Sequence, residues 1–516
     1  MTPNANLFCA LRQAFPADLD AIAIETADGN VGTAPLHYTW RDLDRGTAML
    51  ANLLESLALP AGSRIAVQTE KSVEALMLYL AVLRAGLVYL PLNSAYQSAE
   101  IAYFIGNAQP AVVVCTPRNF GWVSRLAFTA GTTHVFTLND SRAGSLLQRA
   151  SVQSDRHKPA QRSPDDLAAI LYTSGTTGRS KGAMLSHGNL LSNAQVLKTQ
   201  WGWRDGDVLI HALPIFHVHG LFVASHGALL NGSKMIWFGK FDPRAVVKRL
   251  PEATVFMGVP TLYVRLLGEP ALNRVVCSHM RLFISGSAPL LIDTFEDFHT
   301  RTGHTILERY GMSETVMLTS NPYALKDGLR RGGTVGFPLP GVGVRVVNDA
   351  GAPCPADEIG HLQVRGPNVF KGYWQLPEKT KEEFTADGWF KTGDVGQIDA
   401  QGYVIIVGRS KDLIISGGYN VYPAEIEGYL NDMPGVAESA VIGVPHADFG
   451  EAVVGVVVAR PDGRPDPAEL IALLKSQIAH FKVPKRVFVV DELPRNTMGK
   501  VQKNLLREQH KALFGA

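Results

Sequence analysis

Cysteines, long apolar runs and blocks of like charge are scarce in this sequence. It has 4 cysteines in 516 residues, and their wide separation fits neither a metal site nor a disulfide framework. The 49 Lys and Arg residues nearly balance the 47 Asp and Glu residues, which gives a formal net charge of +2. Because no dense basic run is present, we expect neither a nucleic-acid partner nor a membrane-surface partner.

Membrane and export signals are also missing. The most apolar region, residues 75–92, is interrupted by Arg84 and Gly86 and reaches Pro91, so it is too short and too punctuated for a membrane span. The first ten residues lack the basic stretch and apolar core of a signal peptide. We therefore expect a cytoplasmic protein whose thiols stay free. The sequence gives no prediction of the oligomeric state.

Short β-branched runs alternate with helical patterns through the first four fifths of the chain, which predicts an α/β fold of layered sheets and helices. A strand-rich stretch at residues 341–364 predicts a β-subdomain, and the pattern after Gly408 is α+β. We place a large N-terminal domain at residues 1–408, a polar connection at 409–412 and a small C-terminal domain at 413–516. Predicted strands are 64–68, 111–115, 167–171, 209–213, 234–238, 254–258, 281–285, 437–444, 452–459 and 486–490. Predicted helices are 73–85, 243–250, 261–268, 290–302, 424–431 and 467–479.

A run of glycines and hydroxyl residues, 172–182, follows the apolar segment 167–171. Small residues let backbone N–H groups approach phosphate oxygens, and hydroxyls and cations add further contacts. Ser180 stands where a Walker A loop would need its second glycine, so that motif is excluded. The pattern predicts phosphate binding, and the alternative is a solvated turn. The candidate residues are Thr173, Ser174, Gly175, Thr176, Thr177, Gly178, Arg179 and Lys181.

This loop resembles the phosphate loop of the adenylate-forming superfamily, which includes acyl- and aryl-CoA synthetases, luciferases and the adenylation domains of peptide synthetases. Five further segments resemble signatures of that family and occur in the same order, so the resemblance covers essentially the whole chain. They are Leu213-Pro214-Ile215-Phe216-His217, Tyr310-Gly311-Met312-Ser313-Glu314, Thr392-Gly393-Asp394, Gly408-Arg409-Ser410-Lys411-Asp412 and Pro494-Arg495-Asn496-Thr497-Met498-Gly499-Lys500.

The resemblance implies an enzyme that uses ATP and Mg²⁺ to form an acyl-AMP and then passes the acyl group to coenzyme A. Tyr310 offers a flat face for adenine, with residues 285–289 as the opposite wall. Glu314 resembles the Mg²⁺ ligand, since a hard cation prefers carboxylate oxygen. Ser313 replaces the usual Thr and keeps its hydroxyl. The ATP-binding residues implied in this way are Ser285, Ser287, Ala288, Pro289, Tyr310, Gly311, Met312, Ser313, Asp394 (ribose) and Arg409 (ribose or phosphate).

The C-terminal motifs resemble the parts of the family that move between two half-reactions. Lys500 resembles the catalytic lysine, whose charge stabilises attack of the carboxylate on the α-phosphate. Lys411 occupies the hinge position about which the small, mobile domain rotates. Gly417 and Gly418 resemble the wall of the tunnel for the pantetheine arm of coenzyme A.

Four segments around the expected acyl site resemble those of malonyl-CoA synthetases, which act on a short dicarboxylate: residues 216–220, 258–265, 281–290 and 308–312. His217 stands where CoA synthetases carry His or an aromatic residue and amino-acid-activating relatives carry Asp; His219 is a weaker candidate. A distal carboxylate requires a cation, ideally a forked arginine, and Arg265 is the first choice and Arg281 the second. We predict malonate as the substrate and methylmalonate as a second candidate. The alternatives are a short monocarboxylate or aryl-CoA ligase and a carrier-loading adenylation module, which is disfavoured because no carrier domain follows Lys500 and His217 replaces Asp.

Overall fold

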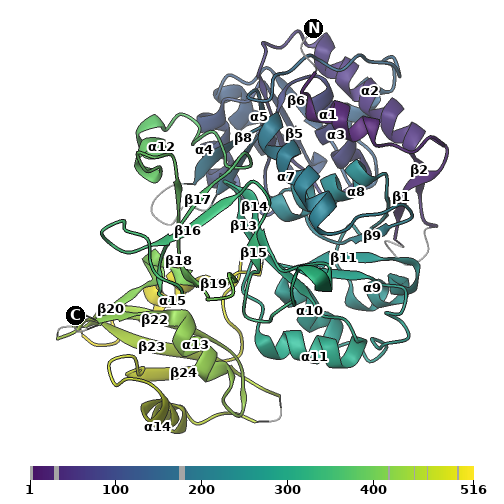
Figure 1. Ribbon diagram of the computed structural model, residues 1–516. Coiled ribbons are helices and arrows are strands. Elements are labelled where there is room, and N and C mark those ends of the chain that lie inside the picture. The colour runs from purple at the N-terminus through teal and green to yellow at the C-terminus, as the bar shows by residue number, and fades with distance from the viewer. Residues whose placement is uncertain are drawn as a thin grey trace. The chain divides into compact units, whose positions relative to one another are not determined.

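The computed structural model describes residues 4–27, 34–173, 180–416, 419–446, 448–461, 463–496 and 499–515. The chain forms two compact units, one of residues 1–343 and 365–388 and the other of residues 344–364 and 389–516 (Figure 1). The predicted fold class, a large α/β part and a smaller C-terminal part, is confirmed. Residues 344–364 and 389–408 pack with the C-terminal residues, so the segment 409–412 lies within the second unit. Its role as a domain boundary stays a prediction.

A mixed sheet with a parallel centre organises one half of the first unit. The strands β10, β9, β11, β12 and β13 are parallel, and β2, β14 and β15 pair antiparallel at the two edges. In spatial order they are β15 (Phe337–Pro338), β14 (Val316–Ser320), β13 (Leu307–Met312), β12 (Leu282–Ser285), β11 (Val255–Gly258), β9 (Val208–His211), β10 (Lys234–Trp237), β1 (Ile22–Thr26) and β2 (His37–Thr39).

A second sheet organises the other half of this unit. Its strands are parallel except for the last, which forms an antiparallel hairpin with β7. In spatial order they are β6 (His134–Thr137), β5 (Val112–Cys115), β3 (Arg64–Gln68), β4 (Val88–Pro91), β7 (Leu167–Thr173) and β8 (Lys181–Ser186).

Helices follow most of the parallel strands of the first unit. Every residue of α3 is buried, as expected for a helix that packs against α1, α2 and β4 rather than facing solvent. The Ser72 side chain caps its first turn by accepting from the Ala75 N–H at 3.1 Å. The helices are α1 (Leu7–Gln13), α2 (Trp40–Ser56), α3 (Val73–Arg84), α4 (Ser98–Ala108), α5 (Phe120–Thr129), α6 (Ser145–Ala150), α7 (His187–Gln200), α8 (His226–Asn231), α9 (Pro243–Arg249), α10 (Pro260–Leu267), α11 (Ile292–Thr302) and α12 (Pro377–Glu383).

The second unit contains two sheets and three of the helices in the described part of the chain. One sheet has the order β16 (Gly343–Val347), β17 (Gly360–Arg365), β18 (Phe390–Ile398) and β19 (Val404–Arg409). The other has the order β21 (Tyr419–Val421), β20 (Ile414–Ser416), β23 (Gly450–Ala459) and β22 (Val436–His446), with β24 (Arg486–Val490) beside β23. The helices are α13 (Pro423–Asn431), α14 (Pro467–Gln477) and α15 (Lys503–His510).

The predicted strands and helices are confirmed, most with ends that differ by one or two residues. Among the elements that were not predicted is the π-helix η2 (His219–Ser225), which continues directly into α8. Seven residues give too little periodicity to distinguish a π-helix from an α-helix in the sequence. Within the described ranges, no helix combines the length and the apolar character needed to cross a membrane.

Candidate active site

The predicted acyl-site segments meet at one edge of the first sheet. The strands β9, β11 and β12 end at His211, Gly258 and Ser285, and β13 pairs in parallel with β12. The loops that leave these carboxyl ends contain the predicted residues around His217, Val259 and Ser287. Ligands in open α/β sheets bind outside the carboxyl ends of the strands, so this edge is the candidate acyl site.

Arg309 in β13 is the residue at this edge that the sequence reasoning missed as a site residue. Its side chain is among the largest fully buried side chains, at 2% exposure. Its Nε and Nη2 atoms have no hydrogen-bond partner among the described residues. Burial lowers the pKa of Arg309 to about 9, opposed in part by Tyr263 and Glu308. A buried guanidinium without an anion is costly, so the site is built to receive one. An arginine within an apolar strand, next to the predicted adenine-binding Tyr310, is the signal that could have revealed it.

The loop after β12 is shaped around Arg309. A Cβ atom on Gly286 would lie 2.5 Å from Nη1 and 2.8 Å from the backbone oxygen of Arg309, so only glycine fits there. Ser287 has a positive φ of 74°, a conformation that is rare for a residue with a side chain and is often found at functional sites. The Ser285 hydroxyl is buried and has no partner among the described residues. These residues belong to the predicted adenine wall.

Glu308 precedes Arg309 and, because side chains alternate along a strand, points to the opposite face. It is 5% exposed, and its Oε1 atom accepts a hydrogen bond from the Leu290 N–H at 3.2 Å. Burial raises the pKa of Glu308 to about 8, while the Leu290 N–H and Arg309 oppose the rise. At neutral pH this carboxyl is therefore mostly protonated, and it does not neutralise Arg309.

Two histidines stand near the acyl edge. His217 is half-buried, and its Nδ1 atom accepts from the His219 N–H at 3.3 Å. His219 is fully buried, with Nδ1 3.4 Å from the Ser287 hydroxyl. Burial lowers the pKa of His219 well below its usual value, and the charge of Arg309 lowers it further. His219 is therefore neutral and can donate or accept a hydrogen bond without adding charge.

The structure gives little support to the two predicted carboxylate-binding arginines. Arg281 precedes β12, at the amino end of the strand and away from the acyl edge. There its Nε lies 2.7 Å from Oδ1 of the buried Asp207 in a two-pronged ion pair, and its guanidinium packs over Tyr323. The hypothesis that Arg281 binds substrate is corrected for this reason. Arg265 is exposed in the last turn of α10, and its role is still untested.

The phosphate-loop candidates lie in the β7–β8 hairpin. Six of these candidates lie outside the described residues: Ser174, Gly175, Thr176, Thr177, Gly178 and Arg179. The two residues flanking them, Thr173 and Lys181, are paired across the hairpin. Lys181 Nζ lies 4.6 Å from the centroid of the Tyr373 ring and 3.7 Å from Oε1 of Glu383. Lys181 is therefore fixed at the exit of the loop.

The β13–β14 hairpin presents the Tyr310–Glu314 motif. Its turn is tight, since a Cβ atom on Gly311 would lie 1.9 Å from the Val316 oxygen, and Val316 itself has a φ of 55°. The buried Glu314 side chain accepts from the Tyr373 hydroxyl at 2.9 Å, and Tyr373 is the ring beneath Lys181. The structure therefore brings Glu314, Tyr373 and Lys181 together. The remaining residues of the motif, Tyr310, Met312 and Ser313, are half-buried.

Glu314 fits a Mg²⁺ ion held mainly by nucleotide phosphates. Mg²⁺ in nucleotide sites is commonly bound by one or two carboxylates together with phosphate oxygens. Over the described ranges, no group of three or more His, Cys, Asp or Glu side chains could hold a metal alone. A single buried carboxylate close to Lys181 suits this shared form of binding.

In the second unit, Asp394 and Arg409 are paired across β18 and β19. Arg409 Nε lies 2.6 Å from Oδ1 of Asp394, whose side chain is 4% exposed. Asp394, the predicted ribose contact, therefore forms an ion pair with Arg409, and this pair orients the Asp394 carboxylate.

The remaining C-terminal candidates lie in turns of the same unit. Lys411 is in the 3₁₀ turn η5 (Ser410–Asp412), where the Ser410 hydroxyl lies 3.2 Å from His361 Nδ1 and Asp412 forms an ion pair with Arg507 at 2.6 Å. Lys500 is exposed, and its N–H donates to Asn496 Oδ1 at 3.0 Å. Gly417 and Gly418 lie outside the described residues.

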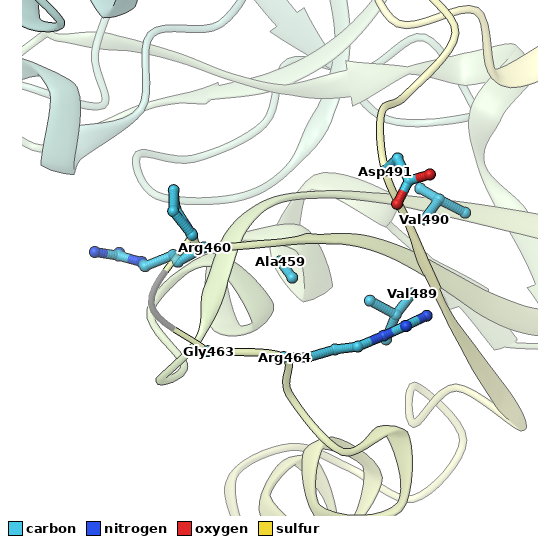
Figure 2. A pocket seen from close by; sticks show the side chains of 8 residues that line it. Ala459, Arg460, Gly463, Arg464, Val489, Val490 and Asp491 are labelled. Atoms are coloured by element: carbon cyan, nitrogen blue, oxygen red, sulfur yellow. The ribbon is translucent and has the colours of Figure 1, made fainter.

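A pocket of about 340 Å³ also lies in the second unit (Figure 2). Figure 2 shows Arg460 and Arg464 projecting from the turn after β23, with Val489 and Asp491 from the end of β24 nearby. The residues lining this pocket include none of the predicted site residues.

The chain matches the AMP-binding enzyme family over residues 16–374 and the AMP-binding enzyme C-terminal domain over residues 425–500. It belongs to the AMP-binding enzyme family. The ATP-bound crystal structure of MatB from Rhodopseudomonas palustris is 54% identical, with a TM-score of 0.95, and the match covers 99% of this chain and 100% of that one. A malonate–CoA ligase of Arabidopsis thaliana is 35% identical over 87% of this chain and 78% of the relative. A feruloyl-CoA synthase of an Amycolatopsis species is also 35% identical, over 94% of this chain and 96% of the relative.

The family assignment confirms the predicted reaction class, an AMP-forming acid–CoA ligase that uses ATP and coenzyme A. The roles of the individual residues remain predictions. The two curated relatives act on different acids, so the acid must be inferred from the acyl edge of this chain.

Proposed function

We propose that this enzyme joins malonate to coenzyme A with ATP and releases AMP and pyrophosphate. One observation carries the choice of acid: the buried Arg309 guanidinium at the acyl edge, with two nitrogen atoms that find no partner among the described residues. A distal carboxylate would satisfy those donors with bidentate, charge-assisted hydrogen bonds. The similarity to MatB and to the Arabidopsis malonate–CoA ligase supports the same choice. Methylmalonate carries the same two carboxylates and is a second candidate.

In the first half-reaction, a carboxylate oxygen of malonate attacks the α-phosphorus of ATP, and the bond to pyrophosphate breaks. Arg309 holds the distal carboxylate, so the other carboxylate is the one left free to react. Lys500 supplies positive charge to the transition state. Glu314, together with the phosphates, would hold Mg²⁺, which neutralises phosphate charge. Lys181, with the loop it follows, binds the phosphates.

In the second half-reaction, the thiol sulfur of coenzyme A attacks the acyl carbon of malonyl-AMP, the bond to the AMP oxygen breaks and the thiol proton is released. Asp394, oriented by Arg409, binds the ribose of the nucleotide. We propose that the C-terminal residues 413–516 turn about Lys411 between the two steps and that Gly417 and Gly418 line the pantetheine path. We also propose that the enzyme acts in the cytoplasm.

The assignment of the distal carboxylate to Arg309, rather than to Arg265 or Arg281, rests on burial and on pairing. Arg309 is buried without a carboxylate partner among the described residues, whereas Arg281 is already paired with Asp207. Arg265 is exposed, and a solvated cation contributes much less selectivity than a desolvated one.

A pyrophosphate-release assay with ATP, Mg²⁺ and coenzyme A tests the proposal. The acids are malonate, methylmalonate, butyrate, benzoate and ferulate, and malonyl-CoA is identified by mass spectrometry. We expect kcat/KM to be highest for malonate and to fall by at least about 30-fold for butyrate, which lacks the distal charge. A preference for butyrate, benzoate or ferulate would refute malonate as the substrate. Pyrophosphate release without a CoA product would favour a carrier-loading module.

A further inference from the structure

A half-buried lysine links the two sheets of the first unit behind the acyl edge. Lys71 lies between β3 and α3, and its Nζ atom is 2.9 Å from Nδ1 and 2.8 Å from the backbone oxygen of His211, at the end of β9. The same ammonium lies 4.3 Å from the centroid of the Trp237 ring. Burial lowers the pKa of Lys71 well below its usual value, and none of the Asp or Glu residues in the described ranges forms an ion pair with it. None of the roles assigned above uses this lysine.

His211 in turn contacts the π-helix. It is 1% exposed, and its Nε2 atom lies 3.0 Å from both the Gly220 backbone oxygen and the Ser225 hydroxyl. The Ser225 hydroxyl donates to the same Gly220 oxygen at 2.9 Å. Gly220 cannot carry a side chain, because a Cβ atom there would lie 2.1 Å from the Pro214 oxygen. The Gly220 backbone is therefore held by the hydrogen bonds to its oxygen and by its close approach to Pro214.

The contacts in this chain set the protonation of His211. The Gly220 carbonyl oxygen can only accept, so Nε2 of His211 must donate to it, and Nδ1 is left to accept from Lys71. Burial and the Lys71 charge both lower the pKa of His211, so the ring is neutral. Its single proton is then on Nε2, which donates toward Gly220 and Ser225. Lys71 therefore holds the ring at Nδ1, while Gly220 and Ser225 hold it at Nε2.

The π-helix that this chain holds carries the acyl-site histidines. His219 is its first residue, and the Leu221 N–H within it donates to the His217 oxygen at 3.0 Å. A π-helix is strained relative to an α-helix and is commonly found at functional sites. A shift at Gly220 would therefore move His217 and His219, whereas the β7–β8 hairpin of the phosphate site is a separate element.

We propose that Lys71 is a positioning residue of the acyl site: by donating to Nδ1 and to the backbone oxygen of His211, it holds that ring against the π-helix and so places His217 and His219 beside the acid. This inference rests on the proposed function, since it assumes that the acid binds at this edge. Lys71 acts through His211 and touches no substrate.

Kinetics of Lys71→Met test this role, with Lys198→Met as a matched control. Lys198 lies in the last turn of α7 and donates to the Leu230 oxygen at 3.1 Å, away from the His211 chain. We expect Lys71→Met to raise KM for malonate about 10- to 100-fold, because small misplacements at a site have effects of this size. KM for ATP should stay within about twofold, and Lys198→Met should match the wild type. Equal losses for ATP and malonate, or no loss, would overturn the proposal.

The hydrogen bond to Nδ1 of His211 gives a readout that needs no substrate. In protein labelled with ¹⁵N-histidine, His211→Gln identifies the His211 signals, which should show the neutral Nε2–H form in the wild type, and the Nδ1 signal should shift in Lys71→Met because its hydrogen bond is lost. An unchanged signal would overturn the inference. A wild type that shows this signal but does not activate malonate would instead refute the proposed function.

A second pair of variants serves if Lys71→Met does not fold. Glutamine at position 211 can accept from Lys71 and donate toward Gly220, whereas leucine can do neither. His211→Gln should therefore retain most of the malonate KM, and His211→Leu should not. Equal KM values for malonate in these two variants would overturn the proposal.

Discussion

Arg309 is kept buried at a cost in folding free energy. Replacing a buried charge with an apolar residue of similar volume is often neutral or stabilising, so an arginine that lacks a carboxylate partner among the described residues points to an external partner. The neighbouring Glu308 does not fill that role, because its pKa is raised to about 8. At the scale of single residues, the candidate acyl site is therefore a buried guanidinium whose expected partner is the anionic substrate.

Replacing Arg309 with leucine should separate the two substrate classes. Leaving the distal carboxylate buried and unpaired costs about 2–5 kcal/mol, which is roughly a 30- to 4,000-fold loss of kcat/KM for malonate. Activation of butyrate should hold or improve, and the free energy of unfolding should not fall. The measurement is kcat/KM for both acids in Arg309→Leu and in Arg265→Leu, which is the matched control. A selective malonate defect in Arg265→Leu alone would return the role to that residue.

Glu308 should make stability depend on pH. Its pKa in the fold is raised to about 8 from an ordinary 4.5, so the folded state holds a proton that the unfolded chain releases. The wild type should therefore lose stability as pH rises through the window between these two values. Glu308→Gln keeps the acceptor for Leu290 and lacks this loss, so it should be more stable than the wild type by about 3–5 kcal/mol at pH 9 and by less than about 1 kcal/mol at pH 5.

Urea unfolding at pH 5, 7 and 9 measures this difference. The matched control is Glu296→Gln on the exposed face of α11, which should show no such trend. A constant difference between Glu308→Gln and the wild type across the three pH values would contradict a protonated Glu308 in the fold.

The elements themselves were largely predictable from the sequence. Strand β3 and helix α3 follow the apolar patterns at 64–68 and 73–85, and the α/β alternation correctly predicted parallel pairing in both sheets of the first unit. The acyl edge was predictable as a set of segments, because carboxyl ends of parallel strands share one edge. Which arginine faces that edge was not, since β13 was not predicted and a helical arginine such as Arg265 gives the same local signal whether exposed or buried. The π-helix and the Lys71–His211 contact depend on pairing between distant segments, which a single sequence does not reveal.

The loop after β12 should be intolerant of even a methyl group. In Gly286→Ala, the added Cβ would lie 2.5 Å from Nη1 of Arg309, so the guanidinium and the nearby backbone must shift. We expect about a 10- to 100-fold loss of kcat/KM for malonate, mostly through KM, and a smaller effect on butyrate. Gly106→Ala in α4, where the new Cβ meets nothing within 4 Å, is the control.

A double-mutant cycle shows whether the effect of Gly286→Ala passes through Arg309. In an Arg309→Leu background, Gly286→Ala should cause little further loss for malonate, because the group that it displaces is gone. Additive losses would instead mean that the loop acts independently of the guanidinium.

At the scale of the whole molecule, the chemistry is divided between the two units. The acyl edge, Glu314 and Lys181 belong to the first unit, whereas Asp394, Arg409, Lys411 and Lys500 belong to the second. Neither unit alone contains all the groups that the proposed reaction needs. A motion of the C-terminal residues would let the two half-reactions use different residues of the second unit.

Lys500→Ala should therefore damage one half-reaction and spare the other. Lysine charge is needed when the carboxylate attacks the α-phosphate, and losing such a charge commonly costs about 10²- to 10³-fold or more. Transfer from supplied malonyl-AMP to coenzyme A involves no attack on phosphorus, so its rate should stay near that of the wild type.

Malonate-dependent ATP–pyrophosphate exchange measures the first step, and malonyl-CoA formed from malonyl-AMP measures the second. Lys511→Ala on the exposed turn after α15 is the matched control and should leave both rates unchanged. Gly418→Leu should give the reverse pattern, with exchange intact and transfer blocked, because a side chain there would narrow the pantetheine path. If Lys500→Ala, in a folded protein, slowed both steps equally, the lysine would serve the fold or both reactions, and the division of labour proposed for the second unit would have to be abandoned.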